Sequence, residues 1–134
     1  MSNHTLKTVL YVEDDKDIQT IGKITLETFG NLNVTTCDSG KEALDIIKDI
    51  KPDLVLMDVM MPEMDGITAM SEFKKDPEIS EIPVIFMTAK AQAHEVESYN
   101  KMGVTGVIIK PFDPVQLYPQ ICKIWENFYA KPAS

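Results

Sequence analysis

Five short apolar segments rich in β-branched residues recur along the chain about 20 to 30 residues apart, with stretches of helical periodicity between them. They are residues 8–12, 32–37, 54–59, 82–88 and 105–109. Strands that alternate with helices predict an α/β domain, in which helices cover both faces of a parallel sheet. Two segments, 54–59 and 82–88, are almost continuously apolar, as is typical of central strands, whereas the more polar 32–37 is expected at an edge.

The first two helical stretches have recognisable faces and ends. In the first, apolar residues recur every three or four positions, which predicts a buried stripe on a helix that ends at Gly30. The stripe consists of Ile18, Ile21, Ile24 (or Thr25) and Phe29. Ser39 and Glu42 form a capping box for a second helix, to about Ile50, and Pro52 stops it.

The later helices follow the same rules. Asp65 is expected to cap a third helix that runs to about Lys75, and Asp113 with Pro114 opens the last one. Further apolar stripes are expected at Val96, Tyr99 and Met102, followed by Gly103, and at Tyr118, Ile121, Trp125 and Phe128. Pro119 lies about one turn inside the last helix, so either the first turn is offset or the helix kinks there.

Composition excludes several classes of protein. The 134 residues suffice for a single domain, with a core at about 7–129 and short tails at both ends. A formal net charge of −8 argues against duplex DNA or an anionic membrane as the main partner. No apolar run approaches the ~18 to 20 residues of a membrane-spanning helix. Cys37 and Cys122 are too few for a disulfide framework or a structural zinc site, and we expect buried, reduced thiols in a cytoplasmic protein.

Polar residues stand at the carboxyl ends of four predicted strands. They are Glu13, Asp14 and Asp15 after the first, Asp58 after the third, Thr88 after the fourth and Lys110 after the fifth. Parallel strands end at one rim of the sheet, and ligands of such sheets bind there. Carboxylates gathered at a rim repel one another, so we expect a compensating Mg²⁺, with Mn²⁺ as a substitute. A carboxylate nucleophile, a metal and donors from Thr88 and Lys110 are what phosphoryl transfer requires.

Taken one at a time, such residues have simpler interpretations. Asp15 and Asp17 are expected to flank and cap the first helix, and a lone threonine or lysine often only forms a strand or reaches solvent. His94 is interpreted as a surface residue. The methionines are interpreted as core and loop filling, including Met57, Met60, Met61 and Met64. None of these interpretations explains why the strand-end residues all meet at one rim.

The strand-end residues lie in stretches that resemble the response-regulator receiver domain, the phospho-acceptor module of two-component signalling. The matching stretches are 9–15, 53–66, 82–89 and 110–112, and the likeness extends from about Lys7 to Phe128. The resemblance implies a flavodoxin-like (βα)5 fold with a five-stranded parallel sheet in the order 2-1-3-4-5.

By position, the resemblance also implies the roles of the acidic residues. Asp58 would be the phosphoryl acceptor. Asp14 and Asp58 would bind Mg²⁺ directly, together with the backbone carbonyl of Met60, and Glu13 would act through a water molecule.

The roles of the residues on the last two strands follow in the same way. Thr88 would hold a phosphoryl oxygen and report phosphorylation, and Lys110 would pair with Asp58 and then with the phosphoryl group. The Lys110–Pro111 bond is expected to be cis.

The chain departs from the family's pattern three residues before this lysine. Most receivers carry Tyr or Phe there, and that ring swings inward when the threonine moves. Val107 occupies the position here, and its stiff β-branched side chain cannot act as an aromatic switch. Gly106 beside it leaves room for other motions of the strand or the preceding helix.

Together these features predict a stand-alone response regulator of a two-component phosphorelay. A histidine kinase or histidine phosphotransfer protein would donate the phosphoryl group, and the output would be contact with a downstream protein rather than turnover of an external substrate. A second hypothesis is a receiver-like interaction module that works without phosphorylation, which Val107 favours slightly. A third is a metal-dependent phosphatase acting through Asp58, but such enzymes usually carry a second acid where this chain has Met60.

Overall fold

The computed structural model describes residues 5–60 and 66–130, along which strands and helices alternate. In chain order they are β1 (Thr8–Val12), α1 (Lys16–Gly30), β2 (Asn33–Cys37), α2 (Gly40–Ile50), β3 (Leu54–Asp58), α3 (Gly66–Lys75), β4 (Val84–Thr88), α4 (Ala93–Lys101), β5 (Gly106–Ile109) and α5 (Pro114–Ala130). Each predicted strand is present, and four of the strands are one or two residues shorter than expected. Within the described residues, no helix combines the length and the apolar character that crossing a bilayer demands.

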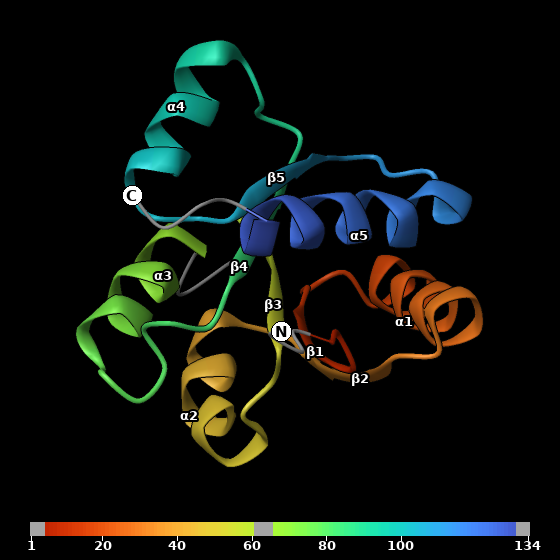
Figure 1. Ribbon diagram of the computed structural model, residues 1–134, viewed down its shortest axis with the longest axis horizontal. Coiled ribbons are helices and arrows are strands. Elements are labelled where there is room, and N and C mark those ends of the chain that lie inside the picture. The colour runs from red at the N-terminus through yellow and green to blue at the C-terminus, as the bar shows by residue number, and fades with distance from the viewer. Residues whose placement is uncertain (1–4, 61–65, 131–134) are drawn as a thin grey trace.

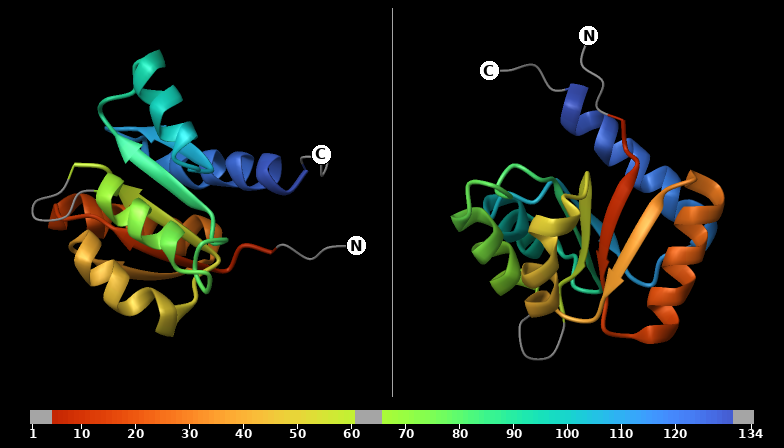
Figure 2. Two further views of the ribbon diagram at one scale, coloured as in Figure 1. Left: turned by 90° about the vertical axis from the view of Figure 1, so that its left-hand side faces the viewer. Right: turned by 90° about the horizontal axis from the view of Figure 1, so that it is seen from below.

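All neighbouring strands are parallel, and their order is β2-β1-β3-β4-β5 (Figure 1). This confirms the predicted flavodoxin-like fold, with the polar strand β2 at an edge. The carboxyl ends of the strands point to one end of the sheet. The beginning of β1 and the last turn of α5 lie at the other end (Figure 2).

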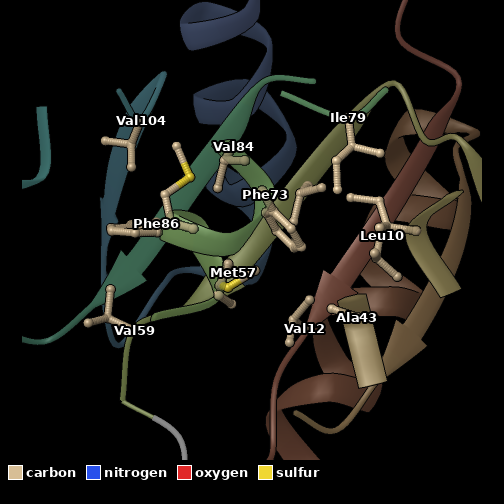
Figure 3. Packing of buried hydrophobic residues seen from close by; sticks show 14 of the residues in the cluster. Leu10, Val12, Ala43, Met57, Val59, Phe73, Ile79, Val84, Phe86 and Val104 are labelled. Atoms are coloured by element: carbon tan, nitrogen blue, oxygen red, sulfur yellow. The ribbon is translucent and has the colours of Figure 1, made fainter. Parts of the chain in front are cut away.

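Helices cover both faces of the sheet, and each face has its own core (Figure 2). On one face, α2, α3 and α4 pack over β-strand residues such as Leu10 and Phe86, with Phe73 of α3 between them (Figure 3). On the other face, α1 and α5 cover Tyr11 and Leu56. Because both faces are covered, every residue of β3 and β4 is buried, as the continuous apolar runs predicted.

The predicted apolar stripe of α1 is wrong except at Ile18, which is half-buried, and at the alternative residue Thr25. Ile21, Ile24 and Phe29 are 46%, 57% and 58% exposed. The face toward the sheet consists of Gln19, Gly22, Thr25 and Leu26, so Thr25, the alternative to Ile24, is the buried one. The reason is close packing: a Cβ on Gly22 would lie 2.5 Å from Cε2 of Tyr11, so only a residue without a side chain fits there.

The predicted ends of the first two helices are largely confirmed. Helix α1 includes Gly30 as its last residue, and Asn31 then turns the chain with a left-handed φ of 51°. In α2, the Ser39 hydroxyl accepts a hydrogen bond from the Glu42 N–H, at 3.1 Å. The helix ends at Ile50, before the left-handed Lys51.

The last two helices agree with their predictions in most positions. Tyr99 of α4 is buried, and Gly103 follows with a φ of 95°. Asp113 caps α5 by accepting the Val115 N–H at 2.9 Å, and the helix continues through Pro119. Its buried residues are Leu117, Ile121 and Trp125, whereas Phe128 is 38% exposed. Asp65, Met61 and Met64 lie outside the described residues.

Candidate functional site

Three carboxylates converge at the carboxyl ends of β1 and β3. Val12 is the register partner of Met57, so Glu13 and Asp14 follow β1 beside Asp58 at the end of β3. One carboxylate oxygen from each acid lies within 4.8 Å of the others. Glu13 and Asp58 are buried and Asp14 is exposed, so the cluster opens to solvent on the Asp14 side.

Lys110 brings a positive charge into this cluster from the end of β5. Its Nζ lies 2.9 Å from Oε1 of Glu13 and 3.4 Å from Oδ2 of Asp58. The backbone N–H of Lys110 donates to the Thr88 carbonyl at 2.9 Å, which fixes the lysine beside β4. The Lys110–Pro111 bond is cis, as expected.

The remaining carboxylate oxygens are held by backbone N–H groups. Oε2 of Glu13 accepts from Asp15 at 3.2 Å, and Oδ1 of Asp58 accepts from Met60, also at 3.2 Å. Both oxygens of Glu13 are therefore engaged inside the protein. This arrangement suits an indirect contact between Glu13 and a bound ion, through a water molecule. It leaves Asp14 as the accessible ligand.

The cluster forms the floor of an open pocket of about 270 Å³. The pocket is lined by Glu13, Asp14, Asp15, Ile18, Asp58, Met60, Ala89 and Lys110. Thr88 is absent from this lining, and its side chain is fully buried. Its Oγ1 accepts a hydrogen bond from the Lys90 N–H at 2.9 Å instead.

Burial and crowding change the acid–base properties of the cluster. Burial raises the pKa of the Glu13 carboxyl to about 7; Asp58 adds to this increase, and Lys110 opposes it. Burial by itself would lower the pKa of Lys110, but its ion pairs with Glu13 and Asp58 outweigh burial and raise that pKa above its ordinary value. The site therefore favours a protonated lysine and has an unmet demand for positive charge at neutral pH.

These residues fit a divalent cation. Carboxylate oxygens are the ligands that Mg²⁺ prefers, and Mg²⁺ uses one or two of them while keeping several waters. Asp14 and Asp58 offer such oxygens at the mouth and floor of the pocket. A divalent ion would also lower the cost of keeping the buried Glu13 ionised.

Sequence reasoning missed one residue that supports the site. Gln19 of α1 is buried, and its Nε2 lies 2.8 Å from the Glu13 carbonyl, 3.1 Å from the Cys37 carbonyl and 3.0 Å from Oδ1 of Asp38. It therefore ties the ends of β1 and β2 together behind the acidic cluster. Gln19 lies beside the predicted apolar stripe of the helix rather than on it, so that stripe gave no signal of this role.

The simpler interpretations hold for several other residues. Asp15 caps α1 by accepting the N–H groups of Asp17 and Ile18, at 3.0 and 3.2 Å. His94 is exposed. Cys37 is buried and Cys122 half-buried, and both are free; burial raises the pKa of the Cys37 thiol to about 12, so it is an inert core residue.

Comparisons with known proteins agree with this geometry. The chain is 33% identical over 119 residues to the Chemotaxis protein CheY-3 of Vibrio cholerae, which covers 89% of the chain and 92% of that protein. It is 34% identical over 117 residues to the Probable transcriptional regulator ycf27 of Guillardia theta, which covers 87% of the chain. The chain spans only 44% of that longer relative.

Solved structures and a family model point the same way. The structure of the chemotaxis response regulator CheY4 of Vibrio cholerae matches with a TM-score of 0.83 at 26% identity, covering 90% of this chain and 99% of that chain. The family model described as the response regulator receiver domain matches residues 9–121. With the strand order and the acidic rim, these findings show that the chain belongs to the response-regulator receiver domains of the CheY-like superfamily.

Proposed function

We propose that this receiver accepts a phosphoryl group on Asp58 from phosphohistidine and signals through a change in its surface. The observation that carries the proposal is the setting of Asp58: a buried carboxylate on the floor of an open pocket, with Lys110 at 3.4 Å. A carboxylate that is held in place and faces solvent on one side is available as a nucleophile.

The chemistry follows from these groups. A carboxylate oxygen of Asp58 forms a bond to phosphorus while the P–N bond of phosphohistidine breaks; the imidazole keeps the electron pair and takes up a proton. The Lys110 ammonium offsets negative charge on the phosphoryl oxygens. Water later attacks the acyl phosphate, which returns the Asp58 carboxylate and inorganic phosphate.

The cation belongs to the same proposal. Asp14, Asp58 and the backbone carbonyl of Met60 would hold Mg²⁺, or Mn²⁺ in its place, and Glu13 would act through a water molecule. When bound, the ion would supply positive charge that stabilises the transferring phosphoryl group. Asp14 is the exposed member of the carboxylate cluster, which supports its role as the ligand that an entering ion meets first.

The partners are proposed from the same chemistry. A histidine kinase or a histidine phosphotransfer protein donates the phosphoryl group, and a downstream protein reads the altered surface. The protein is proposed to work in the cytoplasm as a stand-alone response regulator, without turning over an external substrate.

Intact mass measurement after incubation with acetyl phosphate tests the proposal. We expect one added phosphoryl group that depends on Mg²⁺ and is lost in Asp58→Asn. Asp53→Asn is the matched control, because Asp53 accepts the N–H groups of Lys7 and Thr8 at the opposite end of the sheet. Equal modification of Asp58→Asn would show that another residue is the acceptor.

A failure to react leaves a second test. Some receivers accept only from their kinase, so binding of Mg²⁺ and beryllofluoride is measured next, by the change in amide resonances. Binding at Asp58 supports the acceptor. If neither binds, the proposal is wrong and the interaction module that works without phosphorylation takes its place.

A further inference from the structure

One residue of the connection between β4 and α4 is held from both sides. Lys90 donates its backbone N–H to Oγ1 of Thr88 at 2.9 Å. Its carbonyl oxygen accepts a hydrogen bond from the Tyr99 hydroxyl at 3.1 Å. A continuous path therefore runs from the side chain at the end of β4, through one backbone residue, to a side chain on α4.

Tyr99 is well placed to receive a displacement along this path. It is 6% exposed, and among the described residues of α4 it is the one that is buried. Its ring meets the edge of Phe86 of β4, with ring centroids 5.4 Å apart and planes at 78°. Phe86 lies in the core (Figure 3), and α4 stands out from the other helices (Figure 1). Tyr99 is thus the residue by which α4 enters the core on this face of the sheet.

Under the proposed function, the Thr88 hydroxyl would have to exchange its hydrogen bond with Lys90 for one with a phosphoryl oxygen. To hold a phosphoryl oxygen on Asp58 it must turn toward the pocket, yet it is fully buried and paired with Lys90. The side chain of a threonine moves between discrete staggered positions, so turning withdraws Oγ1 from the Lys90 N–H. The N–H then loses the bond that ties this connection to the end of β4, and because Lys90 is exposed, water can accept it, so the connection becomes free to move.

We propose that Tyr99 is the positioning residue that carries this shift into α4. It takes the place of the ring that other receivers carry at the position of Val107, which has neither an aromatic ring nor a hydroxyl. The inference rests on the proposed function, because a phosphoryl group on Asp58 is what turns Thr88. The surface that changes is then that of α4, whose orientation follows the Tyr99 hydroxyl.

Tyr99→Phe tests the proposal because it keeps the ring and its packing and removes only the hydroxyl. Amide resonances are recorded with Mg²⁺, before and after addition of beryllofluoride. We expect the shifts near Asp58 and Thr88 to persist in the variant, and those of Val96 to Lys101 to fall about threefold or more. Tyr118→Phe on α5 is the matched control and should respond as the native protein does. Full-sized α4 shifts in Tyr99→Phe would overturn the proposal.

A second measurement works without any phosphoryl analogue. Thr88→Val releases the Lys90 N–H, so as a single substitution it should speed amide hydrogen exchange in α4. It should add little further increase in the exchange rate when Tyr99→Phe is already present. Equal effects in both backgrounds would rule out the path. If beryllofluoride causes no shift near Asp58 while the effect of Thr88→Val on exchange still depends on Tyr99, the proposed function is wrong and the path is kept.

Discussion

Lys110 Nζ and Glu13 Oε1 lie 2.9 Å apart although 97 residues separate them in the chain. The side chains are 17% and 1% exposed, so this ion pair sits inside the protein. A buried charge that loses its partner is costly, and here the partner also approaches Asp58. The single lysine therefore influences both carboxylates at once.

Lys110→Met should slow phosphorylation by acetyl phosphate by about tenfold or more, because the charge that offsets the phosphoryl oxygens is removed. The initial rate is measured by intact mass in saturating Mg²⁺. Lys16→Met is the control, since Lys16 pairs with Asp38 at the surface. A native rate in Lys110→Met would mean that the lysine has no part in the transfer.

Glu13 should give the stability of the metal-free protein a dependence on pH. Its pKa is raised from 4.5 to about 7, so the folded protein binds this proton more tightly than the unfolded chain does. The contribution of this group to stability is therefore full below pH 4.5 and is lost as the pH rises to about 7. Urea unfolding in a chelator between pH 5 and 8 measures it, and Glu13→Gln should remove this component of the slope.

Magnesium should reduce the same fall in stability. The ion brings positive charge beside the ionised cluster and binds the folded state better at high pH. The titration is repeated with Mg²⁺ in place of the chelator. An identical slope in both solutions would argue against a cation at this cluster.

Two tyrosines should respond with opposite signs to loss of the hydroxyl. Tyr11 Oη is buried without a hydrogen-bond partner among the described residues, so Tyr11→Phe should stabilise the fold by about 1 kcal/mol. Tyr99 donates to the Lys90 carbonyl, so Tyr99→Phe should destabilise it by about 1 kcal/mol. Urea unfolding compares the two variants, and a change of the same sign in both would contradict these contacts.

A side chain at Gly106 should destabilise the fold while Ile124 is present. A Cβ on Gly106 would lie 2.7 Å from Cγ2 of Ile124 on α5, so the room expected beside Val107 is filled. Gly106→Ala should cost about 1 to 3 kcal/mol of unfolding free energy. Its cost should fall by about 1 kcal/mol or more in an Ile124→Ala background, and strictly additive costs would exclude the clash.

The orientation of α1 predicts unequal costs for two neighbouring apolar residues. Ile24 is 57% exposed, so Ile24→Lys should change the unfolding free energy by less than about 0.5 kcal/mol. Leu26 is fully buried, and Leu26→Ala should cost about 2 to 5 kcal/mol. Similar losses for both would show that α1 is rotated.

The strands and the acidic rim could be predicted because they depend on local rules. Buried parallel strands need continuous apolar residues, and parallel geometry then brings residues such as Asp14 and Asp58 to one end. The face of α1 could not be predicted this way, because the spacing of large apolar residues was taken to mark the buried side of the helix. The sheet instead selects Gly22, which fits against Tyr11, and leaves the isoleucines outside.

The direction in which a side chain points was the other feature that the sequence could not predict. The spacing placed Thr88 at the end of a strand, but no pattern indicates that its hydroxyl accepts the Lys90 N–H instead of lining the pocket. The same holds for Gln19, whose partners are backbone carbonyls on two strands. Hydrogen bonds between segments distant in the chain depend on packing that residue types do not encode locally.

The parallel direction of the strands has a practical consequence for immobilising or labelling the protein. Leu6 and Tyr129 pack against the core on the α1 and α5 side, at the end of the sheet remote from the carboxylates. Asp53 fastens the start of β1 there through the N–H groups of Lys7 and Thr8. A tether, reporter dye or sensor surface joined near either residue would therefore leave the acidic mouth facing outward, open to a partner arriving from solution.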